Sequence, residues 1–372
     1  MVSRNSHLGA LDSFRGIAAL SVVVFHLSIV GAISEWEFFR HSGLFVPFFF
    51  VLSGFVIAYV YDKASFSMKN FMIARSFRIL PLYYVLLFAF LILECLKYVL
   101  YHKLGIFNNT PFSDKNGIEQ ILPNILLLQS WLSWTYPLSF NAPAWSLSVE
   151  WYLYILFGLA MFAPRLMRYS IVLLCVVGAY LHWFGFLTNE SISGILHFGS
   201  GMLIYLVFSL CKNKNLTPLT LTLLELCALV VGIWVVYSGA GKYAVLAFSA
   251  LILVFALSSH ANIATSKGGG LITFVLESKP LFFFGTLSYS IYISHSFVIA
   301  LINIPLRFFT KYGYYEMKYI GERFYIDFHN PIFANLYLVL NLCIVVLVAY
   351  VLHKYIEQPC IAFGKKLCSK SK

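Results

Sequence analysis

The stretch LDSFRGIAALSVVVFHL, residues 11–27, is apolar over most of its length and carries one arginine and one histidine, Arg15 and His26. On an α-helix, the eleven steps between them return to within roughly 20° of the starting face and rise about 16 Å. The two side chains therefore share one stripe. Because the uncharged run begins at Gly16, we expect a membrane helix with Arg15 at its boundary. His26 is then near mid-depth, where ionisable side chains are costly and usually functional.

The composition extends this interpretation to the whole chain. Of 372 residues, 60% are apolar and only 11% are charged, which is too apolar for one soluble core. Ten stretches are long enough to cross about 30 Å of hydrocarbon, and they lie at 16–33, 43–61, 79–96, 146–163, 171–188, 192–210, 219–238, 243–259, 281–302 and 334–353. We therefore expect an all-α polytopic membrane protein. Residues 1–372 are predicted to form a single membrane-embedded domain with no appended soluble domain.

One further apolar segment, ILPNILLLQSWLSW at residues 121–134, is shorter and contains Pro123, Asn124 and Gln129. We predict that it is a re-entrant or interfacial piece rather than an eleventh span. With the N-terminus inside, most lysines and arginines fall in cytoplasmic segments, whereas an eleventh span would turn the lysine-rich C-terminal end outward. Both termini are therefore predicted to be cytoplasmic.

The chain has a formal net charge of +11 and seven scattered cysteines. The positive charge is explained by lysines and arginines in cytoplasmic loops, which set the membrane topology, and by their contact with anionic lipids. No nucleic-acid partner is therefore expected. The cysteines show no CxxC or Cys/His ligand spacing. Neither a metal site nor a disulfide framework is therefore indicated.

Ionisable residues inside the predicted spans need a physical reason, and six are candidates for function: His26, Glu150, His182, His197, Glu225 and His295. Glu150 is expected just below the outer surface, either solvated in a cavity or paired with an Arg or His of another helix. For Glu225 we favour a buried pair or a protonated acid. His182 and His197 flank one outer turn and are interpreted as helix contacts. A hydrogen bond to a neighbouring helix would explain His26 as well.

Two arginines precede the third predicted span, in ARSFRILPLYY at residues 74–84. Their i, i+3 spacing puts Arg75 and Arg78 on one helical face, where two guanidinium groups can hold phosphates bidentately. Ordinary anchoring on the positive side of the membrane is the alternative.

Three further features are candidates for ligand contact. Ser53 and Gly54 lie near the middle of the second span, where a small residue allows either close helix packing or access for a ligand chain. Tyr292 and His295 are three apart and share a face that either lines a polar cavity or bonds a neighbouring helix. The loop at 303–333 is rich in aromatic residues, which either stack on a sugar or form an interfacial belt.

Six motifs follow one another over nearly the whole chain: FRGIAALSVVVFH (14–26), FFFVLSGFVI (48–57), RSFRILPLYY (75–84), AWSLSVEWYLY (144–154), LSYSIYISH (287–295) and IEQP (356–359). In this order they resemble the acyltransferase-3 family, integral-membrane acyltransferases that modify bacterial surface polysaccharides. That family has an Arg or Lys followed, after ten residues, by a His, and Arg15 and His26 match. Arg75 and Arg78 match its RxxR motif, and Glu150 closes its WSLxVE motif.

The resemblance implies transfer of an acyl group, most often acetyl, from cytoplasmic acyl-CoA to a hydroxyl of a glycan. The expected acceptor is a lipid-linked O-antigen or another cell-envelope polysaccharide, and the expected location is the bacterial inner membrane. Acetyl-CoA is the implied co-substrate. A lipid-linked oligosaccharide and membrane lipids are the other implied partners, and no metal is implied.

Within this hypothesis each polar residue has a role. His26 is the general base on the acceptor hydroxyl or is transiently acylated, and Glu150 orients the acceptor or stabilises a charged His26. The residues expected at the donor site are Arg15, Arg75, Arg78, Ser53 and Gly54. The residues expected at the acceptor site are Trp145, Ser146, Tyr292 and His295. Arg15 lies about 16 Å along the helix from His26, too far to activate it by direct contact.

Two other classes of protein fit part of the pattern. Membrane-embedded His and Glu residues on ten spans also describe a proton-coupled transporter or flippase, but the spans show no obvious inverted repeat. A non-catalytic membrane partner is the third possibility, and it predicts that the protein leaves acetyl-CoA intact.

Overall fold

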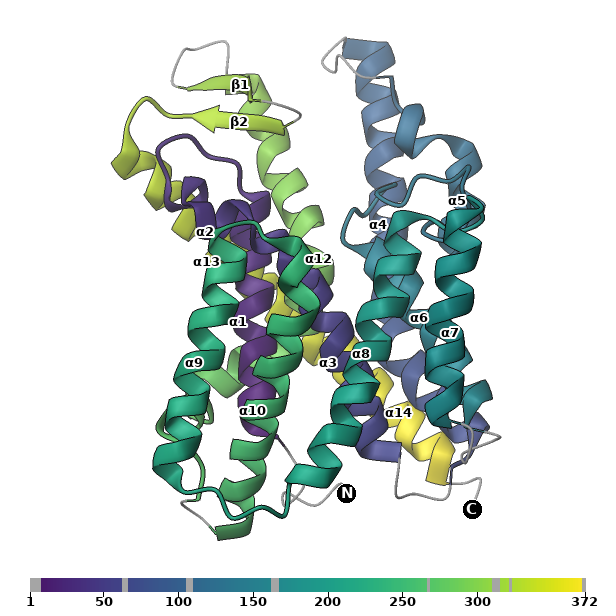
Figure 1. The fold of residues 1–372 in the computed structure, drawn as a ribbon. Coiled ribbons are helices and arrows are strands. Elements are labelled where there is room, and N and C mark those ends of the chain that lie inside the picture. Colours follow the sequence, from purple (N-terminus) through teal and green to yellow (C-terminus); the bar gives the residue numbers. More distant parts are fainter. Residues whose placement is uncertain are drawn as a thin grey trace. The chain divides into compact units, whose positions relative to one another are not determined.

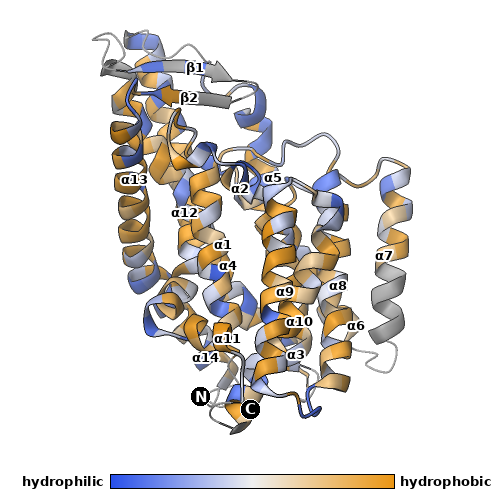
Figure 2. Cartoon of the chain, turned by 60° about the vertical axis from the view of Figure 1, so that its left-hand side comes forward, coloured by the Kyte–Doolittle hydropathy of each residue, from blue (hydrophilic) through white to orange (hydrophobic). Residues whose placement is uncertain are grey.

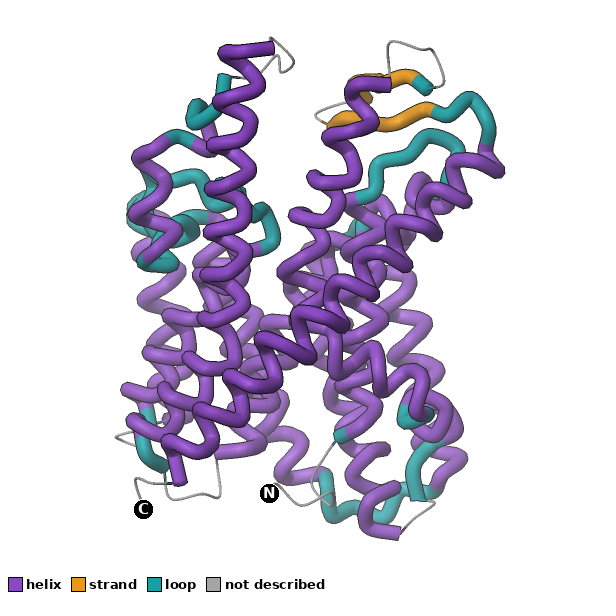
Figure 3. The backbone as a smooth tube through the Cα atoms, turned by 180° about the vertical axis from the view of Figure 1, so that it is seen from behind, coloured by secondary structure: helices purple, strands orange, loops and turns teal. Residues whose placement is uncertain are grey.

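The computed structural model describes residues 8–61, 66–104, 110–161, 167–265, 268–309, 315–320 and 323–369. Helices make up most of this part of the chain (Figure 1 and Figure 3). Each predicted span overlaps one of the ten longer membrane-type helices: α1 (Gly9–His26), α3 (Phe45–Tyr61), α4 (Met68–Leu104), α6 (Ala144–Ala160), α7 (Met167–Trp183), α8 (Asn189–Cys211), α9 (Pro218–Tyr237), α10 (Ala244–Thr265), α12 (Lys279–Phe309) and α13 (Pro331–Leu352).

Shorter elements connect these helices: α2 (Glu37–Arg40), α5 (Ile121–Ile125), α11 (Leu271–Leu276), α14 (Gln358–Ser369), and the strands β1 (Glu316–Ile320) and β2 (Arg323–Asp327). The two strands form an antiparallel hairpin. Eight helices in the described ranges are long and apolar enough to cross a membrane, and α6 is a shorter apolar helix. Figure 2 shows the corresponding hydrophobic colouring along the helices. The prediction of an all-α polytopic membrane protein is confirmed.

The chain divides into two compact units. Unit 1 contains residues 1–63, 197–292 and 298–347, and unit 2 contains residues 64–196, 293–297 and 348–372. The prediction of one domain over the whole chain stays a prediction.

In unit 1, the first span is displaced from its predicted position. α1 runs from Gly9 to His26 and not from 16 to 33, so Arg15 lies within the helix and His26 is its last residue. The early turns form because they are packed: the Ser13 hydroxyl donates a 2.6 Å hydrogen bond to the carbonyl of Leu276. Tertiary contact, and not hydropathy, therefore sets where this helix begins.

The end of α1 has a similar cause. Beyond the helix, the chain pairs with strand β2: the Val30 N–H donates to the carbonyl of Ile326 at 2.9 Å, and the Ile326 N–H donates to the carbonyl of Ser28 at 3.0 Å. Residues in an extended pairing cannot continue a helix. The predicted bounds of the first span, 16–33, are therefore wrong, because β2 pairs with the residues after His26. The mid-depth position of His26 in the membrane stays a prediction.

α1 and the first part of α12 are in backbone contact within unit 1. A Cβ added at Gly16 would lie 2.6 Å from the backbone nitrogen of Gly285, and one added at Gly285 would overlap the carbonyl of Asp12. Two facing glycines thus allow the helix backbones to touch. This contact fixes α1, and with it Arg15 and His26, against α12.

In unit 2, α4 begins at Met68, well before the predicted start of the third span at 79. Arg75 and Arg78 therefore lie inside the helix and not ahead of it. These early turns are covered by α14, where the rings of Phe77 and Phe363 lie 5.3 Å apart. Hydropathy missed them because their packing partner lies near the other end of the sequence.

The 121–134 segment contains only the five-residue helix α5, followed by turns. Its polar residues are buried and bonded: the Asn124 amide donates to the carbonyl of Gln120 at 2.8 Å and to the hydroxyl of Ser139 at 2.7 Å. The hydroxyl of Tyr83 on α4 donates to the carbonyl of Asn124 at 2.6 Å. The segment is therefore not a spanning helix, as predicted.

Candidate functional site

The predicted site residues of unit 1 begin with Arg15 and His26 on α1. The guanidinium of Arg15 lies 3.7 Å from the carboxylate of Asp12, one turn earlier, and both side chains are partly exposed. His26 is exposed at the C-terminal end of the helix, and its ring meets that of Phe25 edge-on at 5.0 Å. An accessible imidazole can receive a ligand, which a buried helix contact could not.

Ser53 and Gly54 lie in the middle of α3. A Cβ at Gly54 would overlap the carbonyl oxygen of Phe198, and a Cβ at Gly201 would overlap that of Val51, so α3 and α8 cross in backbone contact. This contact supports the close-packing interpretation of Gly54. The half-buried Ser53 beside it is compatible with a ligand contact.

Tyr292, on α12, is the last residue of this stretch of unit 1 and is 7% exposed. Its ring meets that of Phe49 of α3 edge-on at 5.4 Å. His295, one turn later on the same helix, belongs to unit 2 and is fully buried. The helical spacing of the two residues is as predicted, and their role as acceptor ligands stays a prediction.

In unit 2, Arg75 has an aromatic environment that the sequence did not predict. Its guanidinium carbon lies 5.7 Å from the ring centre of Phe71 on α4 and 5.4 Å from the ring centre of Tyr154 on α6. Both distances are in the range of cation–π attraction. Arg78 follows one turn later on α4, so the two arginines share a helical face as predicted.

Glu150 lies four residues before Tyr154 on α6 and is half-buried. The Tyr154 hydroxyl donates a hydrogen bond to the Glu150 carboxyl group, while the ring of Tyr154 packs under Arg75. Tyr154 itself is 3% exposed. Tyr154 therefore contacts Arg75 through its ring and Glu150 through its hydroxyl. We call these three residues the α4–α6 cluster.

Sequence reasoning missed Tyr154 because tyrosines are frequent in membrane helices and its second partner comes from α4. The available signal was the i, i+4 spacing of Glu150 and Tyr154 on one helix. Such spacing places two side chains in reach of each other.

The start of α6 is held by the loop before it. Ser130 donates a 2.9 Å hydrogen bond to the carbonyl of Trp145, and the Ser148 hydroxyl donates to the carbonyl of Leu127 at 2.6 Å. Ser146 is buried and bonds within its own turn, to the carbonyl of Pro143 at 3.1 Å. The loop thus positions the helix that carries Glu150. The predicted acceptor roles of Trp145 and Ser146 are not tested by these contacts.

Glu225 of α9 has a different environment, within unit 1. It is fully buried, and its carboxyl group accepts hydrogen bonds from the hydroxyls of Ser258 and Thr273, each at 2.6 Å, and from the N–H of Ile272 at 3.0 Å. We call these four residues the Glu225 cluster. The sequence predicted a buried pair or a protonated acid. The structure shows two hydroxyls and one backbone N–H as donors to the carboxyl group, and the choice between the two alternatives stays a prediction.

His182 contacts the carbonyl of Leu187 in the turn after α7, at 3.0 Å, and its interpretation as a contact between helices stays a prediction. In the aromatic loop, Tyr312 and Tyr314 lie outside the described residues, and Tyr315 is buried against Phe328 with ring centres 5.7 Å apart. Within the described ranges, no group of three or more His, Cys, Asp and Glu side chains is placed to hold a metal ion.

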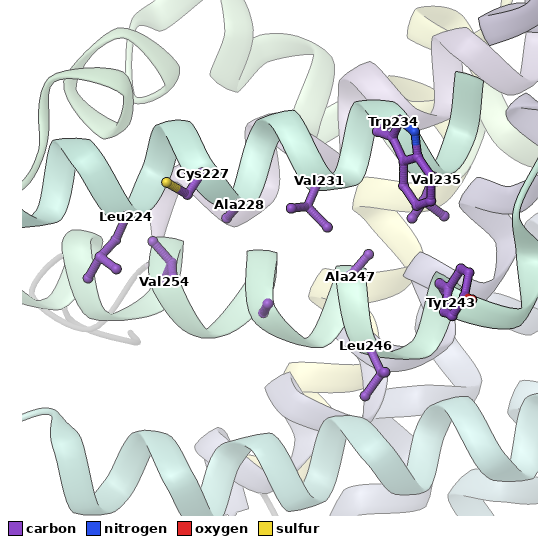
Figure 4. Close-up of a pocket in the computed structure, with 11 residues that line it drawn as sticks. Leu224, Cys227, Ala228, Val231, Trp234, Val235, Tyr243, Leu246, Ala247 and Val254 are labelled. Atoms are coloured by element: carbon purple, nitrogen blue, oxygen red, sulfur yellow. The ribbon is translucent and has the colours of Figure 1, made fainter. Parts of the chain in front are cut away.

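Unit 1 also contains apolar cavities. One, of about 540 Å³, is a groove between α9 and α10, and Figure 4 shows its lining from Leu224 to Trp234 on one side and from Tyr243 to Val254 on the other. A second, of about 290 Å³, lies beside α1 and includes Phe14, next in sequence to Arg15. Both linings are apolar, which suits hydrocarbon and not the polar groups of a donor or a sugar.

Comparison with known proteins places the chain. A family model described as an acyltransferase domain, of the acyltransferase-3 type, matches residues 8–353. The chain belongs to this family. The match contains every residue proposed above for the site, and the resemblance drawn from the six motifs is confirmed. No solved structure matches the chain.

Two curated relatives give the family context. The acyltransferase MdmB of Streptomyces mycarofaciens is 31% identical over 175 residues, which cover 43% of this chain and 40% of MdmB. The peptidoglycan O-acetyltransferase OatA of Listeria monocytogenes is 23% identical over 335 residues, which cover 79% of this chain and 50% of OatA. The chain thus spans half or less of the length of these relatives. By family and by fold, the chain is a multi-pass membrane protein of the acyltransferase-3 family.

Proposed function

We propose that this acyltransferase moves an acetyl group from cytoplasmic acetyl-CoA to a hydroxyl of a cell-envelope glycan, such as a lipid-linked O-antigen, in the bacterial inner membrane. The observation that carries the proposal is the family match over residues 8–353, which contains Arg15, His26, the RxxR arginines and Glu150 together. A relative named as a peptidoglycan O-acetyltransferase supports a glycan hydroxyl as acceptor and acetyl as the group transferred.

The arginines are assigned to the donor. Coenzyme A carries several phosphates, and guanidinium groups bind phosphate oxygens bidentately. Arg75 and Arg78 present two such groups from one helical face of α4, and Arg15 presents a partly exposed one from α1. Ser53 is the further donor contact in this proposal, and Gly54 allows α3 to approach.

His26 is assigned to the chemistry. In the general-base route, its imidazole nitrogen accepts the proton of the acceptor hydroxyl while the hydroxyl oxygen attacks the thioester carbonyl carbon. The intermediate then collapses: the carbon–sulfur bond breaks, its electron pair goes to sulfur, and coenzyme A sulfur takes the proton from His26. In the relay route, the imidazole nitrogen attacks the thioester carbonyl carbon, and the carbon–sulfur bond breaks so that coenzyme A leaves as its thiolate. The acceptor hydroxyl then attacks the acyl-imidazole carbon, the carbon–nitrogen bond breaks with its electron pair returning to the imidazole, and the hydroxyl proton passes to the coenzyme A sulfur. Both routes give an O-acetyl ester and coenzyme A.

Glu150 is assigned to orienting the acceptor, with Trp145, Ser146, Tyr292 and His295 as further acceptor contacts. Glu150 is half-buried and accepts from Tyr154, so one part of its carboxyl group is held while the residue keeps partial exposure. A carboxyl group in this state is able to accept a hydrogen bond from a sugar hydroxyl.

The test is glycan acetylation in a deletion strain complemented with His26→Ala, measured by mass spectrometry of the surface polysaccharide. We expect acetate to be lost while the glycan is still exported and the variant is present in the membrane at normal level. His182→Ala is the matched control, because it removes another helix histidine whose recorded contact is a nearby turn. Full acetylation by His26→Ala overturns the assignment of His26, and loss of export instead of acetate supports a flippase.

A further inference from the structure

We propose that Tyr154 is a positioning residue that couples the donor arginine Arg75 to Glu150. The inference rests on the proposed function, because it concerns how two residues of that function are held. It comes from the contacts of the α4–α6 cluster within unit 2.

Each end of Tyr154 has a different partner. The face of its ring lies under the guanidinium of Arg75, whose central carbon is 5.4 Å from the ring centre. Its hydroxyl donates to the carboxyl group of Glu150, one turn earlier on α6. The ring is also braced by Phe71 of α4, edge-on at 6.1 Å. Because Tyr154 is 3% exposed, water does not compete at its ring, and these contacts define its orientation.

The two contacts reinforce each other. A cation over an aromatic face draws electron density from the ring, which makes the phenolic hydroxyl a stronger donor to a carboxyl group. The hydrogen bond in turn restricts the rotation of Glu150, a side chain that otherwise has several rotamers. A change at Arg75, such as the arrival of a donor phosphate, is therefore transmitted to Glu150 through one side chain.

The two ends can be removed separately. Tyr154→Phe keeps the ring under Arg75 and removes the hydroxyl, so the arginine keeps its cation–π contact and Glu150 loses the hydrogen bond from Tyr154. We expect kcat to fall roughly ten- to a hundred-fold, the range for losing a hydrogen bond to a charged group. The KM for acetyl-CoA is expected to stay unchanged.

Tyr154→Leu removes the ring as well. Arg75 then loses its cation–π partner, and we expect the KM for acetyl-CoA to rise roughly three- to thirty-fold in addition to the fall in kcat. The two variants should therefore differ: Tyr154→Phe lowers kcat alone, and Tyr154→Leu lowers kcat and raises the KM. A general loss of structure would lower only the amount of active protein and would not produce this difference.

Tyr152→Phe is the matched control. It makes the same chemical change on the same helix, two residues away, where the hydroxyl donates to the carbonyl of Leu126 at 3.0 Å. We expect kcat and KM to be unchanged per folded molecule. If Tyr152→Phe and Tyr154→Phe lower kcat equally, the effect is not specific to Glu150 and the inference is wrong.

A second measurement tests the coupling directly. In a Glu150→Gln background, the hydroxyl of Tyr154 donates to a neutral amide, a bond about half as strong. Tyr154→Phe should therefore lower kcat by a smaller factor in that background than in the unmodified protein. Equal factors in the two backgrounds would show that Tyr154 acts independently of Glu150.

These outcomes are distinguishable from failure of the proposed function. An unmodified protein that does not transfer acetyl from acetyl-CoA overturns the function itself. An active unmodified protein whose kcat is unaffected by Tyr154→Phe overturns only the role of Tyr154.

Discussion

The Glu225 cluster and the α4–α6 cluster both place a carboxyl group within apolar helices, but they differ in how that group is used. Glu225 is fully buried and accepts from two hydroxyls and one backbone N–H. Glu150 is half-buried, and its recorded donor is the hydroxyl of Tyr154. The first carboxyl group joins α9, α10 and α11, and the second keeps partial exposure.

The contrast teaches how to separate structural from functional ionisable residues in a membrane protein. A carboxyl group surrounded by its own donors stabilises a fold, because removing it leaves those donors buried without an acceptor. A carboxyl group that remains partly accessible can still be reached by a ligand. The two clusters should therefore respond in opposite ways to substitution.

The largest effect on stability is expected for Glu225→Ala. The change leaves the hydroxyls of Ser258 and Thr273 and the N–H of Ile272 without their acceptor, and each orphaned group costs about 1–3 kcal/mol. We expect the unfolding free energy to fall by at least about 3 kcal/mol. Thermal unfolding of the protein in detergent measures this, together with acetyl transfer per folded molecule, which should be unchanged.

Two variants check this interpretation. Glu225→Gln keeps one acceptor oxygen for the two hydroxyls and should lose less stability, while Glu119→Ala, at an exposed position, should lose none. A Glu225→Ala protein with normal unfolding but no acetyl transfer would break the contrast, because it would make Glu225 a functional residue.

Glu150→Gln is expected to show the opposite profile. The amide keeps the shape of the side chain and an oxygen for Tyr154, so the unfolding midpoint should change little. An acceptor hydroxyl loses its charged partner, and we expect kcat to fall about 100-fold, equivalent to about 2.7 kcal/mol. Steady-state transfer to a defined glycan measures this. Loss of folding without a specific loss of kcat would place Glu150 with Glu225 as a structural residue.

Gly54→Ala tests the same distinction between packing and binding on α3. A methyl group there overlaps the backbone of Phe198, which cannot rotate away, so we expect a loss of about 1–3 kcal/mol of stability. Gly232→Ala is the matched control, since its nearest neighbour is a flexible methyl of Leu251 at 3.2 Å. Unfolding in detergent and the KM for acetyl-CoA should be measured together. An increased KM in Gly54→Ala, at normal stability, would favour direct contact with the donor over packing.

The eight described helices that are long and apolar enough to cross a membrane were predictable. Some twenty consecutive apolar residues are a local property of the chain, and a helix satisfies its own backbone in hydrocarbon. The positions at which the helices begin and end were not predictable from hydropathy. α1 ends at His26 because the next residues pair with Ile326 of β2, and α4 begins early because α14 covers its first turns. Both causes lie far along the chain from the helix that they limit.

The residues of the candidate site also fall into two groups, those that the sequence indicated and those that it did not. Arg75, Arg78 and Glu150 were found because a charge next to or inside an apolar span is conspicuous. Tyr154 and the donors of Glu225 were not found, because hydroxyl-bearing residues are ordinary in such helices and gain meaning only from a neighbour on another helix. Assigning them requires the packing of α6 on α4 and of α9 on α10 and α11.

The smallest effect of a substitution on stability is expected on the β1–β2 hairpin. There the carboxylate of Asp327 forms an ion pair with an exposed lysine, Lys318. Lys318 donates a 2.7 Å hydrogen bond to Asp327, which lowers the pKa of that carboxyl group, and the Asp327 carboxylate together with that of Glu316 raises the pKa of Lys318. The stabilisation from Asp327 is present above the ordinary Asp pKa of about 3.9 and is lost as the pH falls through the lowered value. That from Lys318 is lost only as the pH rises above about 10.4.

Protection of the hairpin amides from hydrogen exchange should therefore be level between roughly pH 4 and pH 10 and decrease below that window. In Asp327→Asn this decrease should be absent and protection at pH 7 slightly lower, whereas Asp114→Asn, at an exposed carboxylate, should behave as the unmodified protein. A large loss of acetyl transfer in Asp327→Asn would contradict the small effect expected for this ion pair. An ion pair whose lysine is exposed is weakened by water and salt, so such a loss would mean that the pairing of β2 with residues 28–30 controls the position of His26.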